Sequence, residues 1–261
     1  MKRNVKLVIQ YDGSQFSGWQ AQNGARTIQG ELTASLFTIL SESVTIVSAA
    51  RTDAGVHAWG SVCNFTTRSA MSVSTLQRAI NSKYRNELSV RSVSEVPLSF
   101  HSRHCATSRL YRYTLLNSRY PEIFLRKYAT WVRQPLDLDL MRDSVKELVG
   151  EHDFSSFRSS HCQAVKPTRT IYSAWIDRRG PFIHCYFRAN SFLQQMIRIL
   201  MGTILMVGIG TMTVDRFLEI RQMKDRRVAG PTVSPTGLCL VDVTYGSIPR
   251  LGYLPDPPSW F

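Results

Sequence analysis

One short stretch of this sequence combines residue types that are suited to chemistry. Between residues 50 and 58, Arg51 and Asp53 place opposite charges two residues apart. Gly55 then permits the positive φ that a sharp turn after the carboxylate needs. Paired charges of this kind occur both in functional sites and in solvated structural turns, so residue types alone leave both interpretations open.

The flanking sequence indicates how this stretch is held. An apolar, β-branched run at residues 44–50 precedes it, and a second strand-like run at residues 61–67 follows it. We therefore expect an exposed loop between two buried strands. Loops on a rigid scaffold often carry catalytic residues, which favours a functional interpretation.

Hydrophobic periodicity predicts an α+β fold with two similar halves. Thr27 is the expected N-cap of a helix whose apolar face includes Ile28, Leu32 and Leu36. The other predicted elements of the first half are strands at 6–11, 44–50, 61–67 and 89–96 and a helix at 73–81. In the second half we predict strands at 109–116, 171–177, 182–189 and 238–245 and helices at 137–149 and 192–207. The strand-helix-strand-strand-helix-strand order of the first half is that of a ferredoxin-like unit, and the second half is predicted to repeat this order of elements without repeating the sequence.

Charge favours a polyanionic partner. Lys and Arg number 32 against 19 Asp and Glu, which gives a net charge of +13. Two basic segments, residues 158–169 and residues 224–227 with the loop 230–237 behind them, are candidates to follow phosphates, although either can also be a solvated loop. A membrane surface fits less well, because no amphipathic anchor or lipidation motif accompanies the charge.

Cysteine usage and the apolar runs favour a cytoplasmic protein. The five cysteines are scattered and never spaced as C-x-x-C, which indicates reduced thiols. His101, His104 and Cys105 lie close together, but on a strand-like segment they would not converge on a metal, so no metal is expected. The N-terminus lacks an apolar signal region. Residues 192–209 approach the length of a membrane span, but they contain Arg198, which favours a core helix carrying one purposeful charge.

Taken together, several separated motifs resemble the TruA family of tRNA pseudouridine synthases and cover almost the whole chain in the family's order. The motifs are Tyr11-Asp12-Gly13 with Phe16 and Gly18-Trp19-Gln20; Thr27-Ile28-Gln29-Gly30-Glu31; Arg51-Thr52-Asp53-Ala54-Gly55-Val56-His57; Phe100-His101 with Arg103; Arg109 with Tyr111-Arg112-Tyr113; His152-Asp153-Phe154 with Ser156-Phe157; Arg188-Ala189-Asn190 with Phe192, Met196 and Ile197-Arg198; and Gly237-Leu238 with Leu240-Val241.

The resemblance implies two ferredoxin-like halves, residues 1–105 with the catalytic loop and residues 106–261. They would form one continuous mixed, largely antiparallel sheet flanked by helices, with a central basic cleft. It also implies a cytoplasmic homodimer that binds tRNA. Its activity would be isomerisation of uridine to pseudouridine at positions 38 to 40 of the anticodon stem-loop, without cofactor or metal.

The resemblance also implies roles for five residues. Asp53 matches the catalytic aspartate, and Arg51 matches an arginine associated with displacing the target base. Tyr111 matches a tyrosine that stacks on the flipped uracil, and Arg198 matches an arginine that pairs with the catalytic carboxylate. Leu193 occupies a neighbouring apolar position that lines the pocket. Without the resemblance, Tyr111 reads as an ordinary strand aromatic and Arg198 as a helix residue reaching solvent.

The sequence departs from the family pattern at two places. Ala50 stands where many members have glycine, a small change in volume. Residues 81–88 carry two extra cations, Lys83 and Arg85, where a leucine-proline turn is common in the family. We expect any difference in target choice or tRNA grip to arise at this second segment.

Two other functions remain open at the level of sequence. A non-catalytic RNA-binding protein could use the same fold as a basic platform. A base-removing hydrolase could use Asp53, but hydrolysis of a glycosidic bond ordinarily needs two carboxylates, and only one lies in the loop.

Overall fold

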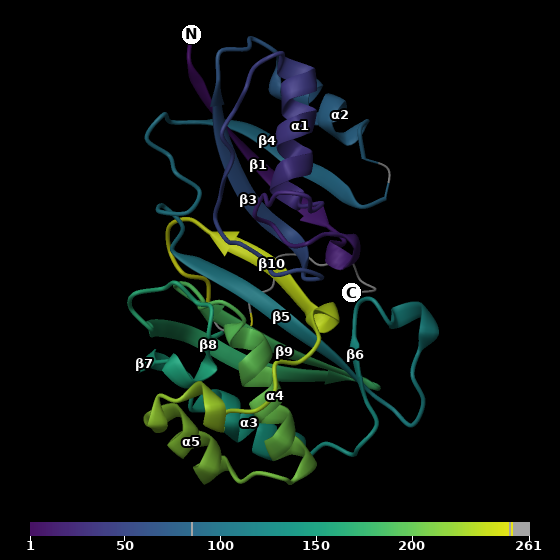
Figure 1. Cartoon of the computed structure of the whole chain (residues 1–261), viewed down its shortest axis with the longest axis vertical. Helices are drawn as coiled ribbons and strands as arrows, with labels where there is room; N and C mark the ends of the chain where they lie inside the picture. The colour runs from purple at the N-terminus through teal and green to yellow at the C-terminus, as the bar shows by residue number, and fades with distance from the viewer. Residues whose placement is uncertain (85, 251, 253–261) are drawn as a thin grey trace. The chain divides into compact units, whose positions relative to one another are not determined.

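The computed structural model describes residues 1–84, 86–250 and 252 and has the predicted α+β class. Its elements fall into two compact units (Figure 1). The first unit comprises Met1–Arg109 and Cys239–Ile248, and the second is built on Leu110–Leu238. Residues 239–248 thus group with the first unit, although the sequence places them in the C-terminal half; the two-domain assignment stays a prediction.

A mixed sheet is the framework of the first unit. Its strands are β1 (Arg3–Tyr11), β2 (Val47–Ser48), β3 (His57–Thr67), β4 (Leu88–Val96) and β10 (Leu238–Thr244). The strand order is β4-β1-β3-β10, and β2 pairs with β3. β1 is antiparallel to both β3 and β4, whereas β10 is parallel to β3, with Cys239 opposite His57. Apolar residues alternate along β1, so Val5, Leu7 and Ile9 are fully buried.

Two helices belong to this unit, and both follow the predicted pattern. Helix α1 (Ile28–Leu40) begins where the sequence predicts, because the Thr27 side chain accepts a hydrogen bond from the Gly30 amide. Its residues Ile28, Leu32 and Leu36 are fully buried, which confirms the predicted apolar face. Helix α2 (Val73–Asn81) has the predicted bounds and buries Leu76 and Ile80.

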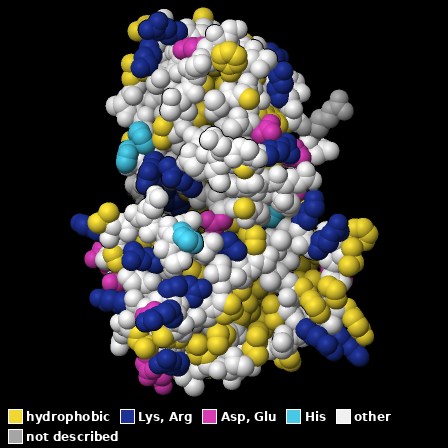
Figure 2. Space-filling model, viewed as in Figure 1, with side chains coloured by type: hydrophobic (Ala, Val, Ile, Leu, Met, Phe, Trp, Pro, Cys, Tyr) yellow, Lys and Arg dark blue, Asp and Glu magenta, His cyan; other side chains and the backbone are white. Residues whose placement is uncertain are grey.

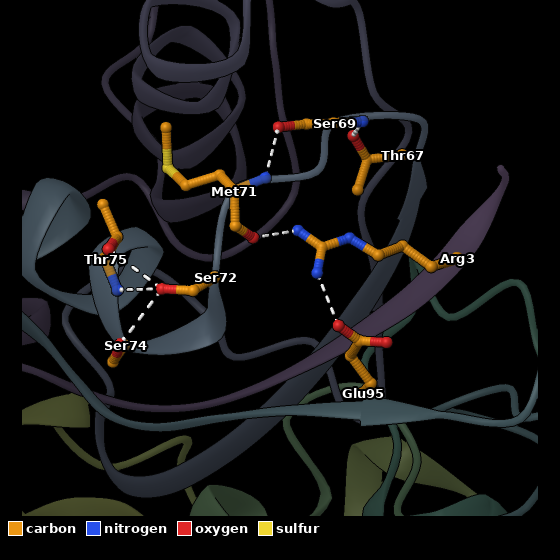
Figure 3. Close-up of polar contacts among 8 residues, drawn as sticks. All are labelled: Arg3, Thr67, Ser69, Met71, Ser72, Ser74, Thr75 and Glu95. Atoms are coloured by element: carbon orange, nitrogen blue, oxygen red, sulfur yellow. Dashed lines mark hydrogen bonds and ion pairs between the residues drawn. The ribbon is translucent and has the colours of Figure 1, made fainter.

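The start of α2 is tied to the edge of the sheet (Figure 3). Ser72 caps the helix by accepting from the Thr75 amide at 3.2 Å. The preceding carbonyl, that of Met71, accepts from the Arg3 guanidinium, which also pairs with Glu95 on β4. One side chain at the beginning of β1 therefore links β4 to the turn that launches α2.

The second unit contains five further strands. Its strands are β5 (Ser108–Asn117), β6 (Thr130–Val132), β7 (Gly150–Asp153), β8 (Thr168–Arg179) and β9 (Phe182–Ala189). They lie in the order β5-β9-β8-β7, and β6 runs parallel to β5. β8 and β9 form the predicted hairpin across Gly180 and Pro181. The short strands β6 and β7 are absent from the sequence prediction, because three or four residues are too few to show an alternating pattern.

Helices α3 (Leu138–Lys146), α4 (Met196–Ile209) and α5 (Val214–Met223) belong to this unit. Helix α4 is buried along almost its whole length, as expected for a core helix. It begins four residues later than predicted, because Gln195 adopts a left-handed conformation at its N-cap. Helix α5 is absent from the prediction, since only Phe217 and Ile220 of its ten residues are buried. Within the described part of the chain, none of the helices combines the length and the apolar character that a membrane crossing requires.

The loop after α5 packs closely on α4. A Cβ atom added to Gly202 would lie 1.8 Å from the Pro231 carbonyl oxygen, so only glycine fits there. The Gly230 amide also donates to Thr203 Oγ1 at 3.0 Å. A Cβ on Gly208, by contrast, would meet the flexible Met141 side chain at 2.6 Å. The loop that follows the basic segment 224–227 is thus anchored on the core helix rather than loosely solvated.

Candidate active site

The loop carrying Asp53 connects β2 to β3 in the first unit. β3 begins at His57, four residues earlier than predicted, and β2 covers only Val47–Ser48 of the predicted strand 44–50. The Val56 amide donates to the Asp53 carbonyl at 3.1 Å, and Gly55 has the positive φ of 78° that the sequence predicts. Arg51 is exposed and Asp53 is half-buried. The loop is therefore a tight turn that leaves its arginine in solvent.

Thr52 anchors this turn to the aromatic loop that follows β1. Its carbonyl accepts from the Trp19 amide at 3.0 Å, and its Oγ1 lies 2.9 Å from the Tyr11 hydroxyl. Burial raises the pKa of Tyr11 well above its usual value, so this hydroxyl stays protonated. Gly18 has a φ of 87°, and a Cβ there would lie 2.7 Å from the Thr52 carbonyl oxygen. The residue before Asp53 is thus fixed through both its backbone and its side chain.

The far end of the turn is held by His57. His57 Nδ1 donates to Asp12 Oδ1 at 3.3 Å, and the Gly13 amide nitrogen lies 3.2 Å from the same ring nitrogen. The hydrogen bond with His57 is the main cause that holds the pKa of Asp12 well below its usual value, with bonds from Ser14 adding to it. Asp12 therefore stays ionised and fixes the start of β3 against the end of β1.

A buried arginine supports the entry to the turn. The Arg109 guanidinium donates to the Ala49 carbonyl at 2.9 and 3.2 Å, and to the carbonyls of Arg103 and Ala106 at 2.8 and 3.1 Å. Ala49 in turn donates its amide to the Val62 carbonyl on β3. Because a charged group is costly to bury unless it is hydrogen-bonded, these carbonyls and Arg109 fix one another in place.

In the second unit, Tyr111 lies on β5 and is buried. Its ring meets Phe192 edge to face, with ring centroids 5.2 Å apart at 83°. Leu193 is also buried, and its carbonyl accepts from the Met196 amide at the start of α4. The segment before α4 therefore places Phe192 directly against Tyr111. Phe192 belongs to the family motif, but the sequence predicted no role for it.

Arg198 lies in the first turn of α4 and is half-buried. Its Nε donates to the Val233 carbonyl at 2.8 Å, and the Val233 amide donates back to the Arg198 carbonyl at 3.3 Å. The guanidinium also lies near Tyr113, whose pKa is raised by burial and lowered less strongly by this charge and by a hydrogen bond to Thr130. A carbonyl of the loop after α5 thus orients the guanidinium.

The five predicted site residues are distributed over the two units. Arg51 and Asp53 belong to the first, whereas Tyr111, Leu193 and Arg198 belong to the second. Tyr11, His57 and Arg109 hold the Asp53 turn in place. All three belong to the motifs shared with the TruA family, but the sequence did not predict this role for them. The predicted meeting of Asp53 with Tyr111 and Arg198 stays a prediction.

The predicted basic segments have structural ties of their own. Asp225 pairs with Arg227 at 2.7 Å, and Lys224 pairs with Asp153 at 3.3 Å. In the other segment, Arg169 donates to carbonyls of its own loop. In the atypical segment 81–88, Asn81 bonds the backbone of Val90 through both its amide nitrogen and its oxygen, whereas Arg85 lies outside the described residues. Phosphate binding by these segments stays a prediction.

The cluster at residues 101–105 is organised around His101. Its ring lies 4.2 Å from that of His104, and its Nδ1 accepts from the backbone amides of Arg103 and His104. Over the residues that the structure describes, no three His, Cys, Asp or Glu side chains are grouped so that they could hold a metal ion.

Comparisons with known proteins address the family directly. The sequence model of the tRNA pseudouridine synthase family matches residues 7–104 and 145–246. The tRNA pseudouridine synthase A of Aeromonas hydrophila is 39% identical over 98% of this chain and 95% of its own length. The protein of the same name from Geobacter sp. strain M21 is 39% identical over 93% of this chain and 99% of its own. A chain from a solved Cbf5-Nop10-Gar1 complex aligns with a TM-score of 0.34 at 15% identity, over 77% of this chain and 45% of that chain. Matches of this extent at this identity mean that the chain belongs to the tRNA pseudouridine synthase family, as its resemblance to TruA predicts.

Proposed function

We propose that this protein is an isomerase that converts uridine to pseudouridine in the anticodon stem-loop of tRNA, at positions 38 to 40. One observation carries the proposal: the turn of the family motif holds Asp53 between two fixed neighbours, Thr52 and His57. A reacting carboxylate must be held within a fraction of an ångström of its productive position, and this bracing supports the proposal because it fixes the backbone on both sides of Asp53. A non-catalytic RNA-binding protein would not need a turn fixed in this way around Asp53.

The reaction sets clear demands on the site. The bond between N1 and C1′ must break, the uracil must rotate, and C5 must bond to C1′. Since the base is unreachable inside a stacked stem, it must first be flipped out, at a cost of a few kcal/mol. We assign Arg51, which is exposed at the turn, to the space that the base leaves. Stacking on Tyr111 then offsets part of that cost, by about 1–3 kcal/mol per base.

Asp53 acts on the sugar in this proposal. It either attacks C1′ or removes the C2′ proton to give a glycal, and both routes need the ionised carboxylate. Loss of water from the site disfavours that charge, whereas a nearby guanidinium favours it. We assign this role to Arg198, which the Val233 carbonyl orients, and a lining role to Leu193 beside Phe192. Only Asp53 supplies a carboxylate in the turn, which suits a reaction that retains its uracil and excludes water.

We also propose how the protein binds tRNA and in which oligomeric state it works. The net charge of +13 supports a basic cleft for tRNA. The resemblance to the TruA family implies a cytoplasmic homodimer that acts on tRNA without cofactor or metal. Size-exclusion chromatography with light scattering tests the dimer.

The function is tested with purified protein and an unmodified tRNA transcript. Carbodiimide treatment followed by primer extension locates pseudouridine, and chromatography detects free uracil. We expect pseudouridine at one or more of positions 38 to 40 and no uracil. Stoichiometric binding without pseudouridine would support the RNA-binding alternative, and release of uracil would support a base-removing hydrolase.

Replacing Arg198 tests its assigned role. Arg198→Met is expected to move the acidic limb of the rate profile to higher pH, because the carboxylate loses a neighbouring cation. Arg198→Lys keeps the charge and serves as the control. An acidic limb that stays in place in Arg198→Met would remove Arg198 from this role.

A further inference from the structure

The connection between β5 and β6, with the strand β6 itself, exposes an unusual set of large side chains. We call residues 118–133 the aromatic arm. Phe124 is 90% exposed, Tyr120 is 68% exposed, and Tyr128 and Trp131 are each 41% exposed. Four aromatic rings within 12 residues form a patch that a chain without a partner rarely presents. In Figure 2, hydrophobic and basic side chains gather on the side of the second unit where Figure 1 draws this connection.

The aromatic arm is an ordered structure. Its short 3-10 helix, Ile123–Leu125, is followed by backbone hydrogen bonds from Tyr128 and Ala129 to the Leu125 carbonyl, at 2.8 and 3.1 Å. Trp131 Nε1 donates to the Ser118 carbonyl at 3.0 Å and joins the two ends of the arm. The rings are thus presented by a fixed backbone, which lowers the entropy lost when a partner binds.

The rings are interleaved with positive charge. The arm contains four cations, Arg119, Arg126, Lys127 and Arg133, against one acid, Glu122, so its net charge is 4 − 1 = +3. The Arg119 guanidinium lies 5.3 Å from the centre of the Tyr120 ring. Aromatic rings beside arginine and lysine are the combination that unpaired nucleotides require, because the bases stack on the rings while the cations neutralise phosphates.

From these observations we propose that the aromatic arm binds unpaired nucleotides of the RNA substrate, with Phe124 and Tyr120 as stacking platforms. The alternative partner for the aromatic arm is a second copy of this chain. In a two-fold dimer centred on the arm, however, the same patch would face itself and bring +3 against +3. A polyanion complements this charge, whereas a second arm repels it.

The arm lies outside both stretches that match the family model, residues 7–104 and 145–246. The arm is therefore a contact surface separate in sequence from the Asp53 turn. That the RNA is tRNA rests on the proposed function. The experiment is accordingly arranged to separate affinity from catalysis.

The test compares tRNA binding by full-length variants, measured by fluorescence anisotropy at several salt concentrations. Phe124→Ala and Tyr120→Ala are expected to weaken binding about 5- to 150-fold each, the range for loss of one stacked base. The rate of pseudouridine formation at saturating tRNA is expected to stay at the wild-type level. Phe124→Trp keeps a ring and is expected to keep the affinity. Ile123→Ala is the matched control, since this side chain is 61% exposed in the same arm but cannot stack.

Three outcomes would overturn the inference. Phe124→Ala and Tyr120→Ala could bind tRNA as the wild type does. Ile123→Ala could weaken binding as much as Phe124→Ala, so that apolar area and not stacking would matter. Phe124→Ala could turn a dimer into a monomer, which would make the arm a contact between copies. If the wild type forms no pseudouridine but its RNA affinity falls with Phe124→Ala, the inference stands and the proposed function fails.

Discussion

The hydrogen bond between Tyr11 and Thr52 offers a direct test of how the Asp53 turn is held. Both side chains are buried, at 4% and 6% exposure, and their oxygen atoms lie 2.9 Å apart. Tyr11→Phe leaves the Thr52 hydroxyl buried without this partner, which is expected to cost about 1–3 kcal/mol of unfolding free energy. Thr52→Val, which keeps the shape of the side chain, is expected to cost a similar amount.

The double variant makes the argument quantitative. With both polar groups replaced by apolar ones, no buried hydroxyl of this pair is left unsatisfied. We therefore expect Tyr11→Phe with Thr52→Val to cost less than the sum of the single variants, by about 1 kcal/mol. Urea unfolding of the four proteins measures the three differences. Strictly additive costs would mean that the two hydroxyls do not stabilise the fold through each other.

The same variants connect the scaffold to catalysis. Because Thr52 precedes Asp53, loosening it is expected to lower the rate of pseudouridine formation about 10- to 100-fold, while the tRNA dissociation constant stays unchanged. Release of tritium from tRNA labelled at C5 of uridine measures this rate, since that hydrogen leaves when C5 bonds to C1′. Full activity in Tyr11→Phe, together with the expected loss of stability, would show that this hydrogen bond does not position the carboxylate.

Two further predictions concern other parts of the fold. Gly202→Ala is expected to destabilise the protein more than Gly208→Ala in thermal unfolding, because its Cβ would meet the rigid Pro231 carbonyl rather than a flexible methionine side chain; equal losses would contradict the observed packing. The pKa of Asp12 is lower in the folded protein than its unfolded value of about 3.9, so the ionised carboxylate stabilises the fold above that pH. This stabilisation is lost progressively as the pH falls from the unfolded pKa through the folded pKa. We therefore expect the stability advantage of the wild type over Asp12→Asn to shrink below about pH 4. An advantage that persisted undiminished at pH 2 would rule out the proposed link to His57.

Local sequence signals predicted much of the first unit. The Thr27 cap, the apolar face of α1, the bounds of α2 and the positive φ of Gly55 all depend on neighbouring residues, and the structure confirms them. The signals failed where they were short or mixed. β7 has four residues, and α5 has few apolar positions, so neither shows a clear period.

The supports of the Asp53 turn could not be read from local patterns. Arg109 reaches Ala49 across 60 positions in the chain, and Tyr11 reaches Thr52 across 41. The Tyr11–Thr52 contact depends on sheet register, because β1 and β3 must pair before these two side chains meet. The late start of α4 likewise depends on the left-handed Gln195, a conformation that residue type does not favour.

The role of Asp53 is the central claim, and one measurement tests it most directly. Wild-type protein and Asp53→Asn are incubated with tRNA labelled with tritium at C5 of uridine, and tritium release and tRNA binding are measured on the same preparations. We expect Asp53→Asn to bind tRNA as the wild type does and to release no tritium above background. Release of tritium by purified Asp53→Asn at the wild-type rate would contradict the assignment of this carboxylate.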